Sequence, residues 1–241
     1  MKKTTTLIVF ICIANAFLTA QNRPIKFGVS VNLNYSHRYV YNDDAVDKAM
    51  LDRLYSGKFS YSIGVFGEKE MTDKLRLRVG LNAMNTGFQI VKKDLQNGGS
   101  QNGGSWNPFP IDPNAPTEIR FIYNFINLEL PIDCQYFINR KRTFFLSLGG
   151  SPMLNVYNYS TFKAYFNTKS TTTNHQELTD EPIKKLSFAL QFGMGYAVKL
   201  TPNLTLEIQP RGQIFVTPLI SSSSKTGVFP YNIGLQTGLI F

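Results

Sequence analysis

The most constraining feature of the chain is a regular alternation of bulky apolar side chains with small or polar ones. Within residues 186–199, every second position holds a bulky residue: Leu186, Phe188, Leu190, Phe192, Met194, Tyr196 and Val198. The positions between them hold Ser, Ala, Gln, Gly and Lys. Because successive side chains of a strand point to opposite faces, a period of two over ten or more residues predicts a β-strand and not a helix.

The same alternation predicts eight strands separated by connections of two kinds. The strands are expected at residues 26–35, 59–68, 75–83, 126–136, 144–149, 186–199, 204–214 and 231–241. Short turns are expected near residues 70–73, 138–142 and 201–203, and long loops near residues 37–57, 91–117, 159–182 and 218–227. Since short and long connections alternate strictly, an up-and-down barrel would place every long loop at one rim and both termini at the other.

Residue size indicates which face of these strands points outward. The polar face is mostly Gly, Ser, Asn, Gln and Ala, which fit the narrow interior of an eight-stranded barrel. The bulky face is too large for that interior and nearly lacks Lys and Glu, so lipid is its expected solvent. The alternative is a soluble barrel with its apolar side inward. We therefore predict an all-β, eight-stranded antiparallel up-and-down transmembrane barrel, with short periplasmic turns and long extracellular loops.

The first residues have the pattern of a targeting signal. Lys2 and Lys3 precede an apolar run that is too short to span a bilayer as a helix. Cleavage after Ala20 is expected, with cleavage after Ala16 as the alternative. Residues 1–20 are thus predicted to be a signal peptide and residues 21–241 the barrel domain, located in the outer membrane of a Gram-negative bacterium. The mature chain would carry a net charge of +7 and a single cysteine, which excludes an intramolecular disulfide.

Charged residues on the inward face form the candidate site. Nine fall there: Lys26, Glu68, Arg76, Arg78, Glu129, Asp133, Lys199, Glu207 and Arg211. Five are basic and four acidic, and most lie close to a short turn, so they should gather in the periplasmic half of the lumen. We expect an ion-pair network in which arginines grip carboxylates and fill the bore. The alternative is a gate or narrow pore whose pairs exchange.

The last strand carries a further signal. Residues 231–241 alternate up to a terminal aromatic, Phe241, which resembles the C-terminal signature of bacterial outer-membrane barrels. Phe241 is therefore the expected assembly signal, and the barrel-assembly machinery is an expected partner. Outer-membrane lipid and lipopolysaccharide are expected to contact the lipid face and the cationic rims, and an envelope protein is a further candidate partner.

The predicted loops contain three distinct segments. Residues 43–54 have the spacing of a short amphipathic helix that would pack on the barrel mouth. Residues 96–100 and 101–105 are a perfect tandem repeat of Gln-Asn-Gly-Gly-Ser, which is a flexible-linker composition. Aromatic residues follow in the third loop, where anchoring at the membrane interface is expected: Tyr159, Phe162, Tyr165 and Phe166.

Motifs for catalysis, metal binding and cofactor binding are not found in the sequence. The two histidines, His37 and His175, fall in different predicted loops. We predict a protein that is not an enzyme and has no cofactor and no metal. Nucleic acid is not an expected partner either, because the sequence has no basic stripe with stacking aromatics and the predicted location is the outer membrane. The alternative is a lipid-modifying outer-membrane enzyme, for which His37 beside Ser36 is a weak signal.

Several strands resemble a known family. Residues 125–137 are Phe-Ile-Asn-Leu-Glu-Leu-Pro-Ile-Asp-Cys-Gln-Tyr-Phe, residues 192–196 are Phe-Gly-Met-Gly-Tyr, and residues 204–208 are Leu-Thr-Leu-Glu-Ile. The chain is similar in these segments to the outer-membrane β-barrel family of Bacteroidetes, whose members include the PorT-like proteins. The resemblance implies an outer-membrane barrel. The PorT-like protein itself is implicated in type IX secretion, so the resemblance also raises a role in a secretion machine.

These patterns lead to three functional hypotheses. The leading one is a non-enzymatic barrel with a structural or recognition role carried by its extracellular loops. The second is a transport or type IX secretion-associated component, and the third is a lipid-modifying enzyme. Single-channel recording separates the first from a pore, and lipid A analysis tests the third.

Overall fold

The computed structural model describes residues 23–42, 55–93, 115–167, 170–178, 183–223 and 226–241. The predicted signal peptide, the helix expected at 43–54 and the tandem repeat at 96–105 lie outside these residues. Among the described residues, no helix is long and apolar enough to cross a membrane.

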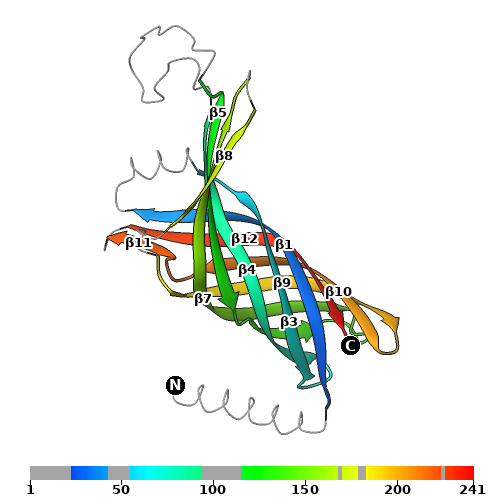
Figure 1. The fold of residues 1–241 in the computed structure, drawn as a ribbon. Helices are drawn as coiled ribbons and strands as arrows, with labels where there is room; N and C mark the ends of the chain where they lie inside the picture. The colour runs from blue at the N-terminus through cyan, green and yellow to red at the C-terminus, as the bar shows by residue number, and fades with distance from the viewer. Residues whose placement is uncertain (1–22, 43–54, 94–114, 168–169, 179–182, 224–225) are drawn as a thin grey trace.

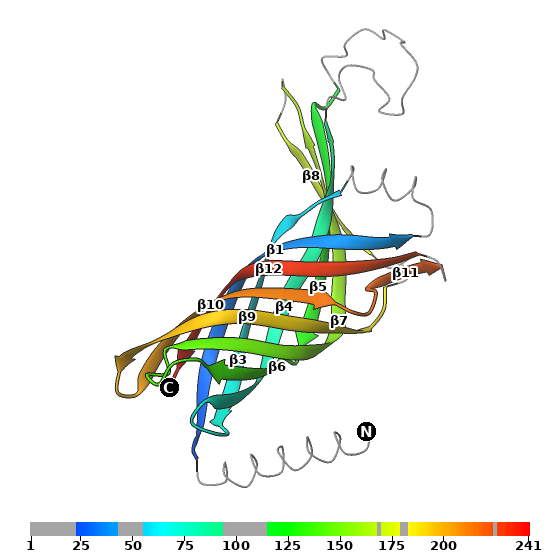
Figure 2. The same cartoon turned by 180° about the vertical axis from the view of Figure 1, so that it is seen from behind.

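The described residues form a single closed antiparallel sheet (Figures 1 and 2). Its strands are β1 (Ile25–Asn42), β2 (Tyr55–Ser56), β3 (Lys58–Glu70), β4 (Leu75–Lys93), β5 (Glu118–Glu129), β6 (Ile132–Phe137), β7 (Phe144–Tyr165), β8 (Thr172–Glu177), β9 (Leu186–Thr201), β10 (Leu204–Phe215), β11 (Ile220–Ser223) and β12 (Thr226–Ile240). The ring order is β1-β3-β4-β5-β7-β9-β10-β12, and β1 pairs with β12 to close it. This confirms the predicted all-β barrel of eight strands.

Strands β5 and β6 together occupy a single strand position in the barrel wall. Both pair with β4 on one side and β7 on the other, and Leu130 and Pro131 separate them. Proline has no N–H to give to a ladder, which explains the break. The break is nevertheless bridged, because Leu130 N donates to Pro152 O at 3.0 Å and Gly80 N donates to Pro131 O at 2.9 Å. The closure of the barrel is therefore preserved.

Several strands extend well beyond the range expected from the alternation. β4 runs to Lys93, β5 begins at Glu118 and β7 reaches Tyr165, so parts of the predicted loops are strands. The end of β4, the start of β5, the end of β7 and β8 pair in sequence and project from the ring (Figure 1). We call this projection the blade. The alternation did not predict the blade as strand, because its residues lie outside the lipid and do not separate into an apolar and a polar face.

The two faces of the ring strands have the predicted character. Bulky residues point outward, with Phe27 66% and Leu148 68% exposed. Small polar residues point inward, and Ser60, Asn127 and Ser151 are 0% exposed. The size argument thus placed the faces correctly.

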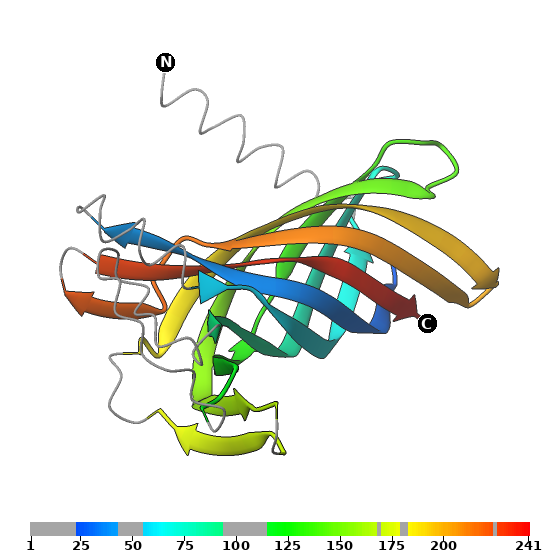
Figure 3. The same ribbon diagram turned by 90° about the horizontal axis from the view of Figure 1, so that it is seen from above.

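The two rims differ as the connection lengths suggested. The β3–β4, β6–β7 and β9–β10 turns lie at one end, which we call the turn rim, together with the C-terminus (Figure 3). β11 and the end of β1 lie at the opposite end, the loop rim, from which the blade also extends (Figures 1 and 3).

Candidate functional site

Four charged side chains form a closed quartet inside the bore near the turn rim. β4 supplies Arg76 and Arg78, β3 supplies Glu68 and β10 supplies Glu207. Arg76 Nη1 lies 2.8 Å from Glu68 Oε2 and 2.7 Å from Glu207 Oε1. Arg78 Nη2 lies 2.7 Å from Glu68 Oε2 and 2.5 Å from Glu207 Oε2. Each arginine thus binds both carboxylates, and the quartet is electrically neutral.

The local strand geometry explains how the quartet assembles. Arg76 and Arg78 are two residues apart on β4, so they point to the same face. Glu68 is the register partner of Arg78 on the neighbouring strand β3. Glu207 comes from β10, which lies four places away from β4 in a ring of eight and therefore faces it across the bore. The quartet consequently joins both walls of the barrel.

Aromatic rings enclose the quartet. The Arg78 guanidinium carbon lies 4.0 Å from the centroid of the Phe66 ring, and that of Arg76 lies 4.6 Å from the Phe137 ring. The buried Nε atoms of both arginines have no hydrogen-bond partner within the described part of the chain. Stacking on the rings stabilises these cations where hydrogen bonds do not.

A second layer lies next to the quartet along the bore. Arg211 Nη1 donates to Gln236 Oε1 at 2.5 Å, and a second nitrogen of Arg211 donates to Gln191. Gln191 Nε2 in turn donates to Asp133 Oδ1 at 2.5 Å. Arg211 Nη1 and Asp133 Oδ2 are 3.9 Å apart. This layer connects β6, β9, β10 and β12 through one chain of polar contacts.

Glu129 is the centre of a third layer. Its Oε2 accepts from Asn82 Nδ2 at 3.0 Å, and its Oε1 accepts from Ser151 Oγ at 2.8 Å and from Gln213 Nε2 at 2.6 Å. Asn232 Nδ2 donates to Gln213 Oε1 at 2.8 Å, which extends the layer to β12. Neutral donors therefore surround this carboxylate, and the layer fills the middle of the bore.

The loop-rim half of the bore contains apolar clusters and a buried lysine. Met84, Met153, Ala189 and Phe215 pack together beside the third layer. Lys58 Nζ donates to Asn85 Oδ1 at 2.8 Å and to Asn124 Oδ1 at 2.7 Å, joining β3 to β4 and β5.

An apolar cluster closes the loop-rim end of the bore. Its buried members are Phe88, Phe125, Leu219 and Val228. Arg38 lies on its edge, with its guanidinium carbon 3.0 Å from the centroid of the Tyr55 ring. Together with the polar layers, this cluster places buried side chains at successive levels of the bore between the two rims.

The nine sequence-predicted charged residues divide into four groups in the structure. Glu68, Arg76, Arg78 and Glu207 form the quartet, Asp133 and Arg211 share the second layer, and Glu129 lies in the third. Lys26 and Lys199 lie at the turn rim and are exposed, and Lys26 Nζ is 3.6 Å from Glu70 Oε1. The structure therefore brings seven of the nine together in the bore and leaves two at its mouth.

Sequence reasoning missed several residues of this interior. Phe66 has the inward parity of β3 but was not assigned to a face because it is large and apolar. Glu70 lies at the end of β3 and pairs with Arg142 at 2.9 Å, and Lys58 is at the start of that strand. Continuing the parity of β3 to Lys58 and Glu70 would have found both.

The two histidines lie in strands and not in loops as expected. His37 belongs to β1, and its ring stacks on Tyr231 with centroids 5.5 Å apart. His175 belongs to β8, and its Nδ1 lies 3.0 Å from Thr161 Oγ1. Among the described residues, no group of three or more His, Cys, Asp and Glu side chains is arranged to hold a metal ion.

The C-terminal residue is held to the first strand. Phe241 N donates to Phe27 O at 2.9 Å, and the Phe241 side chain is 61% exposed on the outer face. The terminal aromatic therefore lies at the β1–β12 seam, on the turn-rim side.

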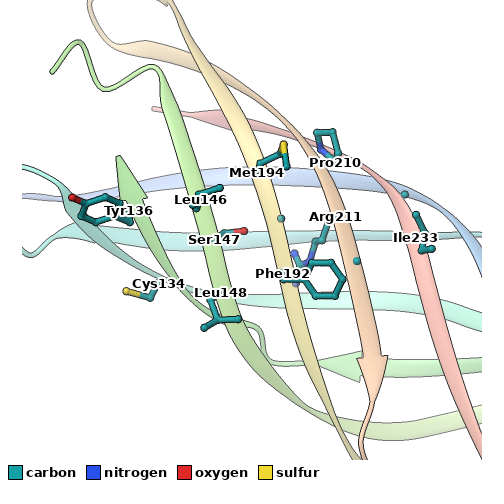
Figure 4. A pocket seen from close by; sticks show the side chains of 13 residues that line it. Cys134, Tyr136, Leu146, Ser147, Leu148, Phe192, Met194, Pro210, Arg211 and Ile233 are labelled. Carbon is teal, nitrogen blue, oxygen red and sulfur yellow. The ribbon is translucent and has the colours of Figure 1, made fainter. Parts of the chain in front are cut away.

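The outer face carries an apolar depression of about 740 Å³ over β6, β7, β9, β10 and β12 (Figure 4). Pro210 has no ladder partner on β9, and Gly212 leaves room for the Phe192 ring to lie against its backbone. Leu146 and Met194 are also among its walls. The depression is thus a consequence of local gaps in the lipid-facing surface, and at its base it reaches Ser147 and Arg211, whose buried side chains belong to the bore.

Comparison with protein families agrees with this architecture. Residues 19–210 match the model of the outer membrane protein beta-barrel domain. The chain belongs to this outer-membrane β-barrel family. Family and fold together place the protein in the outer membrane, with its bulky face in lipid. No curated protein sequence matches the chain.

Several solved structures are similar to the chain at low identity. Neisserial surface protein A is 11% identical with a TM-score of 0.39, over 89% of this chain and 97% of that one. Ail of Yersinia pestis is 10% identical with a TM-score of 0.34, over 88% and 97%. The outer membrane protease OmpT from Escherichia coli is 11% identical with a TM-score of 0.40, over 91% and 96%. The family assignment rests on the match to residues 19–210.

Proposed function

We propose that the protein is a closed, non-enzymatic outer-membrane barrel that presents a recognition surface outside the cell. The observation that carries the proposal is the filling of the bore. Three polar layers centred on Arg76, Arg211 and Glu129 are followed by the apolar cluster around Phe88. A path for solutes would have to disrupt each of them.

The quartet is the most costly of these layers to open. Removing one partner of a buried ion pair costs about 3–5 kcal/mol, because the other charge is left uncompensated. Each quartet member has two such partners, and all four side chains are at most 7% exposed. This supports a static plug in preference to a gate whose pairs exchange.

The recognition surface in this proposal is the blade. A tilted transmembrane strand needs only about 9–11 residues, whereas β7 has 22. All six residues of β8 are exposed. With the turn rim in the periplasm, the blade extends from the cell surface.

Planar-bilayer recording tests the closed bore. We expect no resolved conductance steps from the wild-type barrel at moderate voltage. Folding in the same proteoliposomes is checked by gel electrophoresis with and without heating, because the barrel migrates more slowly once heating has unfolded it. Reproducible steps from inserted wild-type protein would exclude the plug and favour the transport alternative.

Epitope labelling tests the orientation. A tag inserted at Gly99 should be labelled on intact cells, and a matched tag at Arg140 in the β6–β7 turn only after the outer membrane is ruptured. The opposite pattern would place the blade in the periplasm and remove it as a cell-surface element.

The geometry around Ser36 supports the non-enzymatic assignment. Ser36 is 0% exposed, and its Oγ donates to Gly87 O at 2.8 Å. The neighbouring His37 has its Nδ1 within hydrogen-bond distance of the Arg38 backbone. Lipid A mass spectra from wild-type and deletion strains should therefore be identical, and a difference restored by the wild-type gene alone would establish the enzyme alternative.

The proposed partners are lipopolysaccharide at the lipid face, the assembly machinery through Phe241, and an envelope protein at the blade. Membership in the PorT-like group of Bacteroidetes, with a part in type IX secretion, is the narrower alternative. Co-purification from outer membranes separates them: a blade partner should be lost when residues 166–177 are replaced by a Gly-Ser linker. Recovery of secretion-machine components irrespective of the blade would favour the alternative.

A further inference from the structure

Cationic side chains are concentrated at the turn rim. Residues 23–26, 69–74, 140–142 and 199 contain eight cationic and two acidic side chains, which gives a net charge of +6. The cations are Arg23, Lys26, Lys69, Lys74, Arg140, Lys141, Arg142 and Lys199. Because the chain from residue 21 onward has a net charge of +7, most of its excess charge lies at this one end.

Part of this charge surrounds a cavity of about 360 Å³ at the mouth of the bore. Lys26, Lys141, Arg142 and Lys199 line it, and Thr143 and Thr205 are also among its lining residues. Its volume falls at the lower end of the range of small-molecule sites. The cavity is therefore lined by several positive donors and is large enough for a small ligand.

The floor of the cavity does not cancel this charge. Glu68 and Arg76 form part of the floor, and they belong to the neutral quartet. The remaining carboxylate is Glu70, which Arg23, Lys26 and Arg142 share at 3.6, 3.6 and 2.9 Å. Neither Lys141 nor Lys199 forms an ion pair with a carboxylate of the described residues. The lining residues comprise five cations and two carboxylates, a net charge of +3. A concave surface with such an excess of positive charge concentrates counter-ions, so the mouth attracts anions.

The turn that carries two of these cations is firmly held. Asn139 Oδ1 accepts from Thr143 N at 3.0 Å and from Phe144 N at 3.1 Å. Arg142 has a φ of 56°, a left-handed conformation that is uncommon for residues other than glycine. Asn139 Nδ2 donates to Thr143 Oγ1 at 2.6 Å, so the Thr143 hydroxyl proton is left to donate elsewhere. The backbone that carries Lys141 and Arg142 is thus held in place before any ligand arrives.

We propose that this mouth binds a small soluble molecule bearing phosphoryl groups, a function beyond the recognition proposed for the blade. Three lysines from different segments, two threonines and Arg142 line one volume, in addition to the paired Arg76. Lysine acts on phosphate as a point charge from any direction, and a phosphoryl group offers several oxygens to such donors. A single planar carboxylate would use fewer of them. Lys141 and Lys199 supply the charge that the rim carboxylates do not neutralise.

Calorimetric titration with inorganic pyrophosphate tests the site, using the folded barrel in an uncharged maltoside detergent. We expect saturable binding at one site per barrel, weaker at high salt because exposed charges are screened. The double variant Lys141→Gln, Lys199→Gln should lower the affinity by about tenfold or more, since it removes two charged hydrogen bonds. The matched double variant Lys69→Gln, Lys74→Gln removes the same net charge outside the cavity and should change the affinity by less than about twofold.

The remaining outcomes overturn the proposal. Equal losses in both double variants would mean general attraction to a positive rim and no site. Absence of saturable binding to the wild type would exclude it directly. Citrate binding more tightly than pyrophosphate would assign the mouth to carboxylates. Pyrophosphate binding that is lost in phosphatidylglycerol nanodiscs but retained in phosphatidylcholine nanodiscs would assign the mouth to lipid headgroups. The heat-induced gel shift confirms in each case that the variant is folded.

Discussion

Arg78 Nη2 lies 2.5 Å from Glu207 Oε2, although the two residues are 129 positions apart in sequence. Their strands, β4 and β10, stand opposite each other in the ring. The pair therefore braces the barrel across its diameter, in addition to the ladders that connect neighbouring strands around its circumference.

Arg76→Ala should destabilise the barrel by about 3–5 kcal/mol, because Glu68 and Glu207 would each lose a buried partner. The measurement is the urea midpoint of unfolding in detergent micelles, followed by circular dichroism. The control is Lys74→Ala at an exposed turn position, which should be within about 0.5 kcal/mol of wild type. An Arg76→Ala midpoint equal to that of wild type would contradict the importance of the quartet.

Glu129→Gln should cost about 1–3 kcal/mol. Both carboxylate oxygens accept hydrogen bonds, from Ser151, Gln213 and Asn82. The amide NH₂ that replaces one oxygen would face a donor, since glutamine has one acceptor oxygen only. Glu177→Gln in the exposed strand β8 is the matched control. The two variants should differ clearly in thermal midpoint, and similar midpoints would show that the third layer tolerates a donor.

Gly195→Ala should destabilise the barrel by about 1–3 kcal/mol through overpacking. A Cβ at Gly195 would lie within 2.2 Å of the Phe145 ring, which is buried on the inward face. Gly67→Ala is the control, because a Cβ there would be no closer than 3.7 Å to a neighbouring atom. The folded fraction after refolding, read from the heat-induced gel shift, should fall only for Gly195→Ala; a fall for both would point to backbone effects.

Leu148→Lys should cost about 2–4 kcal/mol in lipid, since it places a charge on the hydrocarbon-facing surface. Ile138→Lys is the matched control: Ile138 is 58% exposed and lies at the turn rim, where water is accessible. Unfolding in liposomes by guanidinium gives both values. Equal costs would contradict the assignment of the outward face of β7 to the membrane interior.

The alternation of residue size was sufficient to predict the ring strands and their faces. Phe188 and Gln191 illustrate why: side chains of a strand differ in environment at every second position, so composition by parity reports burial directly. The same parity placed Arg76, Arg78 and Glu207 on the inward face. Their mutual contacts depend on strand number and stagger, which fix which strands stand opposite, and a single sequence does not specify that stagger.

The alternation is less informative at the two ends of the barrel. Lys26 and Lys199 have inward parity, but both lie at the mouth where the bore opens to water, so their side chains remain exposed. In the blade, both faces are outside lipid, and residues 86–93 of β4 lose the alternation while remaining paired with β5. The alternation of side chains therefore reports their burial only in the part of the barrel that lies between the two rims.

The β1–β12 seam constrains how the barrel forms. Val31 pairs with Thr237 and Tyr39 with Phe229, so the last strand of the ring in chain order pairs with the first. Every other ladder of the ring can form between strands adjacent in the chain, but this one must wait for the whole domain. Contacts of such long sequence separation slow folding. Until they form, two unpaired strand edges are exposed, and a protecting factor would be needed for that whole interval.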